Sequence, residues 1–101
     1  MKAHEILNAP GKWSKRSLAK DSLGRAVRYD SPEACSFCIM GALKRAYKQA
    51  PFEDYLVARA NLAKAISPHS KQGRYDVITQ WNDASHRTFS QVRNLLLKLD
   101  I

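Results

Sequence analysis

Residues 31–49 contain the pattern that most restricts the fold of this chain. Ser31-Pro32-Glu33 combines a hydroxyl that caps helices, a proline at the first helical position and an acid in the first turn. We therefore predict a helix from there to about Gln49. Its apolar positions follow the i, i+3, i+4, i+7 series of a buried helical face, and they are Cys35, Cys38, Ile39, Ala42, Leu43 and Ala46. Because many of these residues are small, we expect another element to pack very close to this central helix.

Four more segments have helical patterns. A short helix is predicted over Lys2 to Asn8, ended by Pro10-Gly11. A longer one is predicted over Phe52 to Ile66, with Phe52, Leu56, Ala63 and Ile66 on its buried face. After a polar loop at residues 69–73, Val77, Ile78 and Trp81 indicate a short helix that closes at Asn82-Asp83.

The last helix has the clearest start. Thr88-Phe89-Ser90-Gln91 fits a capping box, with a hydroxyl at the cap and Gln three residues later. Its predicted buried face is Phe89, Val92, Leu95, Leu96 and Leu99. The apolar face formed by Leu95, Leu96, Leu97, Leu99 and Ile101 suits a dimer interface as well as a core, so the oligomeric state stays open.

Residues 13–29 show no helical period. Asp21-Ser22-Leu23-Gly24 is a turn signal, and its flanks, residues 16–20 and 25–29, are able to pair as a hairpin. A lone hairpin is marginal in water, so this one has to pack on the helices. The predicted fold is a mainly α, compact single domain over residues 1–101, with four to five helices and a small β-hairpin or irregular basic arm at about residues 13–29.

Composition places the chain among ordinary globular proteins, with 45% apolar and 26% charged residues. Its first fifteen residues lack the apolar region of a signal peptide, and the apolar run 37–43 is far too short to span a membrane. The two cysteines, three residues apart, would close only a tiny loop. We expect a soluble, reduced, cytoplasmic protein with no membrane association, no metal and no cofactor.

Positive charge is the main clue to a partner. The formal net charge is +8, and six basic residues lie between residues 12 and 28 with only Asp21 opposing them. We call residues 12–28 the basic segment. Such clustering favours an acidic protein surface or nucleic acid as partner, while anionic lipid is disfavoured because the segment has no amphipathic period. A solvated hairpin face that only keeps a small protein soluble is the remaining interpretation. The predicted partner-binding residues are Trp13, Lys15, Arg16, Lys20, Arg25, Arg28 and Tyr29.

Three arrangements for catalysis or metal binding are weighed and disfavoured. Cys35-Ser36-Phe37-Cys38 has redox spacing, but both sulfurs fall on the predicted apolar stripe, which favours buried structural cysteines. The three His residues lack the spacing of a zinc site. A nucleophile and base built from Cys38, His86 and Asp83 would place the thiol among core residues of a helix. An enzyme of this kind is therefore only a third hypothesis, and no catalytic residue is assigned.

The second candidate surface lies around residues 81–88. Trp81, Asn82, Asp83, His86 and Arg87 combine an aromatic ring, polar groups and a cation, which suits recognition. A structural interpretation accounts for them too. In it Trp81 anchors the core, Asn82 or Asp83 bonds loop backbone, Asp83 pairs with Arg87, and the following threonine caps the last helix.

The order of several motifs resembles a family of small uncharacterised bacterial and phage domains. These motifs are Trp13, Asp21-x-x-Gly24, Cys38-x-x-Gly41-Ala42-Leu43, Trp81-Asn82-Asp83, Arg87-Thr88 and Val92, within residues 13–99. The resemblance implies no established activity and supplies no catalytic or binding residue. It implies architectural roles for Gly41, Ala42 and Thr88, and leaves Cys38 and the loop at 81–83 as places for a shared function. The positive charge is not part of the family pattern, so it indicates a partner particular to this chain.

We accordingly expect a non-catalytic binding protein of bacterial or phage origin. It would occupy or inhibit a host macromolecule through its basic surface. The alternative hypothesis is a nucleic-acid-binding protein without sequence preference, and the third is the cysteine-dependent enzyme above.

Overall fold

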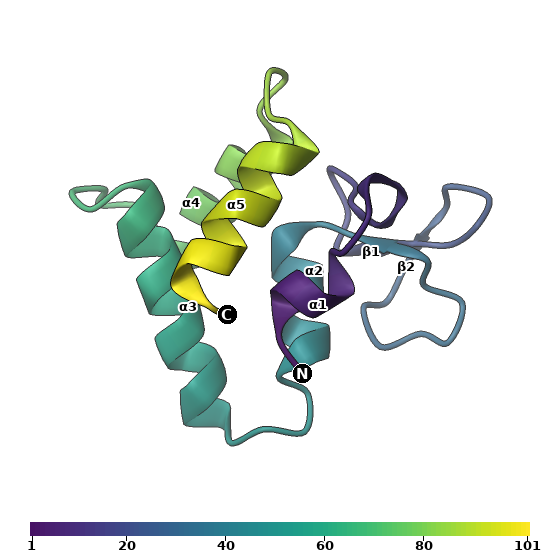
Figure 1. Ribbon diagram of the computed structural model, residues 1–101, viewed down its shortest axis with the longest axis horizontal. Coiled ribbons are helices and arrows are strands. Elements are labelled where there is room, and N and C mark those ends of the chain that lie inside the picture. The colour runs from purple at the N-terminus through teal and green to yellow at the C-terminus, as the bar shows by residue number, and fades with distance from the viewer.

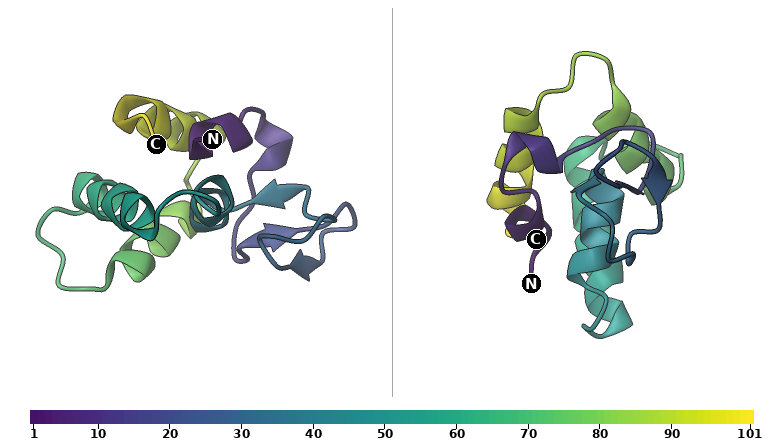
Figure 2. Two further views of the ribbon diagram at one scale, coloured as in Figure 1. Left: turned by 90° about the horizontal axis from the view of Figure 1, so that it is seen from below. Right: turned by 90° about the vertical axis from the view of Figure 1, so that its right-hand side faces the viewer.

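The helices are arranged in three layers around α2 (Figures 1 and 2). The computed structural model describes residues 1–101. In the left view of Figure 2, α2 and α3 form the middle layer, α1 and α5 lie on one side of it, and α4 lies on the other. None of these helices is long and apolar enough to cross a membrane. The helices are α1 (Ala3–Ile6), α2 (Ile39–Ala46), α3 (Phe52–Ile66), α4 (Arg74–Asp83) and α5 (Phe89–Leu99), with a single 3-10 turn at Pro10–Lys12.

A small antiparallel sheet extends from one edge of the helices. Its strands are β1 (Ala19–Lys20), β2 (Ala26–Val27) and β3 (Ser36–Phe37), in the order β2-β1-β3. The predicted hairpin is confirmed, because β1 pairs with β2 across the 21–24 turn. In that turn Gly24 has φ of +79°, and Asp21 Oδ1 accepts bonds from the Leu23 and Arg25 amides. The third strand was not predicted.

The predicted helix start at Ser31 is wrong. Residues 31–34 form a turn, in which Ser31 Oγ accepts a bond from the Glu33 amide. Ser36–Phe37 then pairs with β1, and α2 begins only at Ile39 with Cys38 as its N-cap. The Ser-Pro-Glu signal is local, whereas the pairing with β1 depends on a strand sixteen residues earlier, and this longer-range pairing prevails over helix propensity.

The closest approach to α2 is at Gly41, which lies outside the predicted apolar stripe, and the element that packs there is not a helix. A Cβ on Gly41 would lie 1.7 Å from the carbonyl oxygen of Leu18, in the chain leading into β1. That same oxygen accepts a hydrogen bond from the Cys38 amide at 3.3 Å. Gly41 therefore lets the basic segment lie directly against the first turn of α2.

The buried face of α3 differs from the prediction at its start. Tyr55, Ala58, Leu62 and Ala63 are buried, whereas Phe52 is 67% exposed. Phe52 is the first residue of α3, and the two residues that follow it in the first turn are exposed as well. In α5 the prediction is confirmed: Thr88 and Gln91 form the capping box, and the five residues predicted on its buried face lie in the core or pack against it, whereas Leu97 is exposed.

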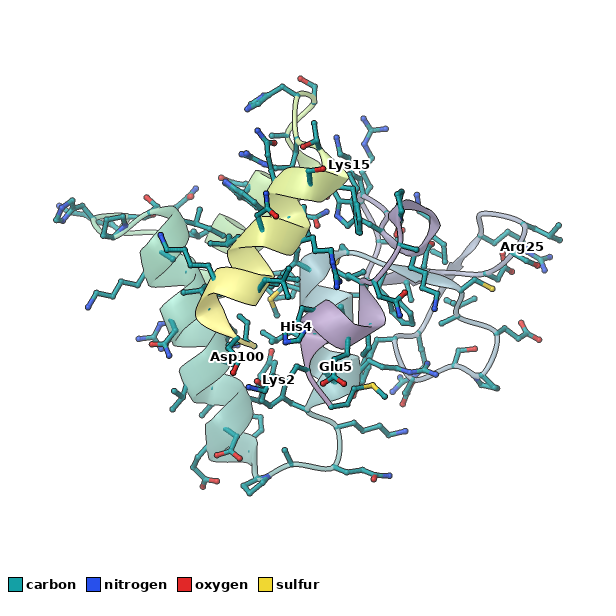
Figure 3. All side chains as sticks on the ribbon, viewed as in Figure 1. Lys2, His4, Glu5, Lys15, Arg25 and Asp100 are labelled. Carbon is teal, nitrogen blue, oxygen red and sulfur yellow. The ribbon has the colours of Figure 1, made fainter.

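The two ends of the chain are joined. Lys2 and His4 of the N-terminal segment contact the Asp100 carboxylate at 2.7 and 3.2 Å, and Figure 3 shows these three side chains together beside the end of α5. Arg93 donates two hydrogen bonds to backbone carbonyls of residues 4 and 7. Ile101 is buried, which places this end of the α5 apolar face in the core rather than at a free surface.

Candidate functional site

Asn82 links the basic segment to the helices. Its side chain is fully buried near the C-terminal end of α4. Its Oδ1 accepts bonds from the Trp13 indole N–H at 2.8 Å and the Ile39 amide at 3.0 Å. Its Nδ2 donates to the Ser14 carbonyl at 3.1 Å and to Asp83 Oδ1 at 2.9 Å. Two donor bonds and two acceptor bonds meet the hydrogen-bonding capacity of a buried amide, so one side chain joins the segment, α2 and α4.

Several residues predicted to contact a partner use polar groups to fix the segment on the rest of the molecule. Trp13 is half-buried, and its indole N–H is used by Asn82. Lys15 donates to the Ala84 carbonyl at 2.8 Å and lies over the Trp13 ring. The backbone amide of Arg16 donates to Asp83 Oδ1, and Arg16 itself has a φ of +72°. Asn82 and Asp83 do bond backbone, as expected, but they bond a segment almost seventy residues away rather than their own loop.

The cations of the basic segment do not form one patch. In Figure 3, Lys15 lies at the turn between α4 and α5, and Arg25 lies at the far tip of the hairpin. Arg25 pairs with Asp21 at 2.9 Å and Arg28 with Asp30 at 3.0 Å. The Arg25 amide and then its guanidinium lower the pKa of Asp21, and the Arg28 guanidinium lowers the pKa of Asp30. The remaining basic residues of the segment, Lys12, Arg16 and Lys20, have side chains without a partner in the chain.

A small pocket of about 160 Å³ lies where the segment meets α2 and α4. Its lining includes Arg16, Cys38, Tyr75, Thr79 and Asp83. The Cys38 thiol accepts a bond from the Gly41 amide at 3.4 Å, and burial raises its pKa. The thiol is thus a neutral helix cap, as expected of a structural cysteine.

The other parts of the cysteine hypotheses are not assembled. His86 is exposed and does not line the pocket that contains Cys38 and Asp83, so no imidazole reaches the thiol. The expectation that Cys35 is buried is wrong. Cys35 is exposed beside the sheet, because the helix on which it was placed begins later. Three or more His, Cys, Asp or Glu side chains do not gather anywhere as metal ligands would.

The residues of the second candidate surface mostly make contacts within the molecule. The Arg87 guanidinium lies 3.8 Å from the centre of the Trp81 ring and donates to the Trp81 carbonyl at 2.9 Å. Arg87 also contacts Gln91 of the capping box. The predicted ion pair between Asp83 and Arg87 is wrong, because Asp83 faces Arg16 and Asn82 instead.

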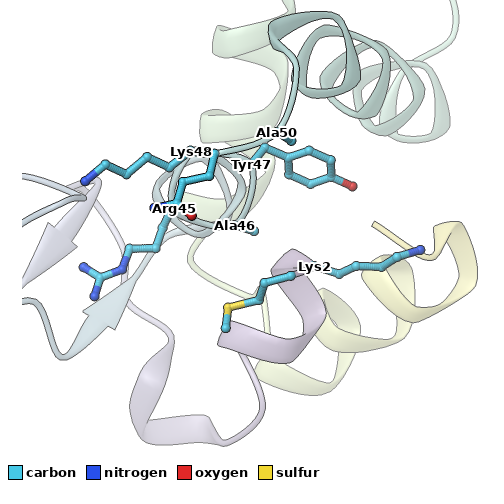
Figure 4. Close-up of a pocket in the computed structure, with 8 residues that line it drawn as sticks. Lys2, Arg45, Ala46, Tyr47, Lys48 and Ala50 are labelled. Atoms are coloured by element: carbon cyan, nitrogen blue, oxygen red, sulfur yellow. The ribbon is translucent and has the colours of Figure 1, made fainter.

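The largest hollow, of about 600 Å³, lies between the first residues of the chain and the C-terminal end of α2. Figure 4 shows Arg45 and Lys48 on one side of it, with the Tyr47 ring pointing the other way and Lys2 extending towards α5. Arg45 donates to the carbonyls of Tyr29 and Ser31, and Lys2 is paired with Asp100. Its cations are therefore mostly engaged in holding the fold together.

Most of the positive charge is not neutralised within the chain. Of the seventeen Lys and Arg side chains, three pair with carboxylates, namely Lys2, Arg25 and Arg28. Four others donate only to backbone carbonyls or a glutamine. The remaining ten have no hydrogen bond or ion pair, and they are Lys12, Arg16, Lys20, Lys44, Lys48, Arg59, Lys64, Lys71, Arg74 and Lys98.

Two of these unpaired cations lie among aromatic rings on a surface shared by α2, α3 and α4. Lys44 Nζ lies 5.8 Å from the centre of the Tyr29 ring and 5.9 Å from that of Tyr75. The Arg59 guanidinium lies 5.4 Å from the centre of the Tyr55 ring, whose other neighbour is Phe52, with ring centres 5.7 Å apart. We call this surface the aromatic–cation face, and it consists of Tyr29, Lys44, Phe52, Tyr55, Arg59 and Tyr75.

The aromatic–cation face lies next to the basic segment in two places. Tyr29 directly follows the segment, and Tyr75 lines the small pocket together with Arg16. The two hollows on the face, lined by residues that include Arg59, have no aspartate or glutamate in their lining. The face and the unpaired cations at its border therefore form a positively charged surface.

Comparison with known families identifies the family of this chain. A model of a family of unknown function, DUF6197, matches residues 1–99. The chain belongs to this family. The resemblance to an uncharacterised family is thus confirmed, and no curated protein and no solved structure matches this DUF6197 member.

Sequence reasoning found only Tyr29 of the aromatic–cation face. The signal for part of the rest was present, since Phe52, Tyr55 and Arg59 have helical spacing and share one side of α3. We assigned Phe52 to the core instead. Lys44 and Tyr75 join the face only through packing of α2 and α4, which no local pattern indicates.

Proposed function

We propose that this DUF6197 domain is a non-catalytic binding protein that acts by occupying an acidic macromolecule. The observation that carries the proposal is that ten of its seventeen basic side chains have no partner within the chain. Unpaired cations on a small domain attract a polyanion and speed its association.

The contact surface is proposed at the junction of the basic segment with α2 and α4. Arg16 and Tyr75 line one pocket there, and Tyr29 and Tyr75 share Lys44. Trp13 and Lys15 are removed from the proposed contacts because their polar groups are bonded internally. Arg25 and Arg28 contribute little net charge because each is paired with a carboxylate.

Binding to two fluorescent polyanions tests this proposal. One is a polyglutamate peptide and the other an oligonucleotide of about 16 nucleotides, each titrated with protein at about 50 mM and about 200 mM salt. We expect at least one to bind, with an affinity that falls as salt is raised. Absence of binding to both at the lower salt concentration would refute the proposal.

Charge reversal then locates the contact without disturbing the fold. A double variant with Lys44→Glu and Lys48→Glu changes two unpaired side chains that line one hollow with Tyr29, whereas reversal of Lys15 would break its bond to Ala84. We expect the double variant to bind more weakly and to melt as the wild type does. A matched double variant at Lys64 and Lys98, two unpaired lysines of α3 and α5, is the control for net charge alone.

A further inference from the structure

The side chain of Arg59 has a hydrogen-bond donor without an acceptor. Its Nε atom is buried and has no hydrogen-bond partner in the chain. A buried N–H without an acceptor is costly, and such groups in native structures call for a specific explanation. Its guanidinium lies over the Tyr55 ring, which attracts the charge but accepts no strong hydrogen bond. The terminal nitrogens of the Arg59 guanidinium have no partner in the chain either, and phosphate matches the donor geometry of these groups.

Lys44 also lacks a partner in the chain. Its ammonium group has no carboxylate or carbonyl partner and lies 5.8 Å from the Tyr29 ring centre and 5.9 Å from that of Tyr75. Because the ammonium group lies near two rings, an anion that approached it would arrive beside an aromatic surface. The ligand that fits this position carries negative charge next to a flat group.

The rings themselves are available to a ligand. Phe52 is 67% exposed and Tyr75 is 40% exposed, although large apolar side chains are usually buried. Tyr55 is buried beneath Phe52 and Arg59 and supports them. Aromatic rings set among cations are the arrangement on which unpaired bases stack while phosphates meet the charges.

We propose that the aromatic–cation face binds single-stranded nucleic acid without strong sequence preference. Phe52 and Tyr75 stack on unpaired bases, and Lys44 and Arg59 contact the phosphates. A duplex fits less well because its bases are already stacked on one another. An acidic protein surface would offer carboxylates to the cations but has no need of exposed ring faces beside them. This inference rests on the proposed function and names the class of acidic macromolecule and its place of binding.

The test compares three labelled polyanions on the whole chain. They are a single-stranded oligonucleotide of about 16 nucleotides, the matching duplex, and inorganic polyphosphate, which has charge but no rings. We expect the single strand to bind more tightly than the duplex. Phe52→Ala and Tyr75→Ala should each weaken single-strand binding at least about five-fold, the lower end of what one stacked base contributes.

Matched controls separate stacking from charge. Leu97 is 45% exposed on α5, so Leu97→Ala removes exposed apolar surface away from the face and should leave binding unchanged. Polyphosphate binding should be the same in Phe52→Ala, Tyr75→Ala and the wild type. Lys44→Met should lower the slope of log affinity against log salt by about 0.7, the value for one phosphate of a single strand, whereas Lys64→Met should not.

The outcomes distinguish this inference from the proposed function. Single-strand binding that Phe52→Ala and Tyr75→Ala leave unchanged would overturn the inference, and so would binding of polyglutamate without binding of the oligonucleotide. Either result keeps the proposed function. If no polyanion binds, the proposed function fails as well. Thermal melts and circular dichroism of each variant confirm that a loss of binding is not a loss of fold.

Discussion

Replacement of Asn82 by alanine should destabilise the protein more than any other single loss of a polar side chain. The substitution removes four hydrogen bonds and leaves the Trp13 indole N–H, the Ile39 amide and the Ser14 carbonyl without their partner. A buried polar group that loses its partner costs about 1–3 kcal/mol. The Ile39 amide is the most enclosed of the three, and water can relieve part of the loss at the others.

The expected cost is therefore about 3–5 kcal/mol, a large share of the roughly 5–15 kcal/mol that stabilises a domain of this size. Urea titrations followed by circular dichroism give the change in the free energy of unfolding. In a thermal melt, the same loss should lower Tm by at least about 12 °C, since about 1 kcal/mol corresponds to 4–8 °C for such a domain.

Asn61 provides the matched control, because it is exposed on α3. Asn61→Ala should change the free energy of unfolding by no more than about 0.5 kcal/mol. A double-mutant cycle with Trp13→Phe should show a coupling energy of about 1 kcal/mol with Asn82→Ala. The interpretation of Asn82 as the link between the segment and the helices is refuted if both asparagine variants cost the same and the cycle is additive.

Three further predictions concern packing, thiols and pH. Gly41→Ala should cost about 3 kcal/mol or more, because its Cβ would meet the carbonyl oxygen just before β1 at 1.7 Å, while Gly11→Ala, with no neighbour within 4 Å, should be neutral in the same urea titration. A thiol reagent should label only Cys35 rapidly in the folded protein and Cys38 only in urea; two rapid equivalents would contradict the assigned burial. Asp100 has a pKa lowered by its bonds to the lysine and histidine of the N-terminal segment. The ionised Asp100 carboxylate therefore stabilises the fold above its unfolded pKa, and this stability is lost as pH falls from about 5 downwards. Asp100→Asn removes this carboxylate, and asparagine tolerates the left-handed backbone at this position. We expect Tm to fall less steeply with acid in this variant than in the wild type, whereas parallel curves of Tm against pH would contradict the assignment.

Elements with a strong local signal could be predicted from the sequence. The capping box at Thr88 and Gln91 marks the start of α5, and the apolar period and flanking prolines mark α3. The Asp-to-Gly turn likewise marks the hairpin, because Gly24 takes the positive φ that the turn requires. In each case the residues that determine the element lie within it.

The start of α2 could not be predicted for a different reason. The Ser31 signal competes with strand pairing between residues 36–37 and β1, and that pairing is visible only once the chain has folded. A helix that starts at Ser31 has Cys35 on its buried face. The wrong start of α2 therefore also led to the wrong prediction that Cys35 is buried.

The candidate site was predictable in its charge but not in its location. Composition indicated an acidic partner, yet it could not show that Trp13 and Lys15 are used internally by Asn82 and Ala84. Lys44 and Tyr75 lie on different helices and meet only through the packing of α2 and α4. Contacts of this kind depend on the whole fold and leave no periodic trace in the sequence.

The most direct test of the proposed binding surface is an NMR titration of ¹⁵N-labelled protein with a single-stranded oligonucleotide. We predict that the largest amide shifts and line broadening will cluster at Tyr29, Lys44, Phe52, Arg59 and Tyr75, with smaller changes at Arg16 across the small pocket. Shifts confined to Lys12, Lys20 and the tip of the hairpin, with the aromatic–cation face unchanged, would contradict this account.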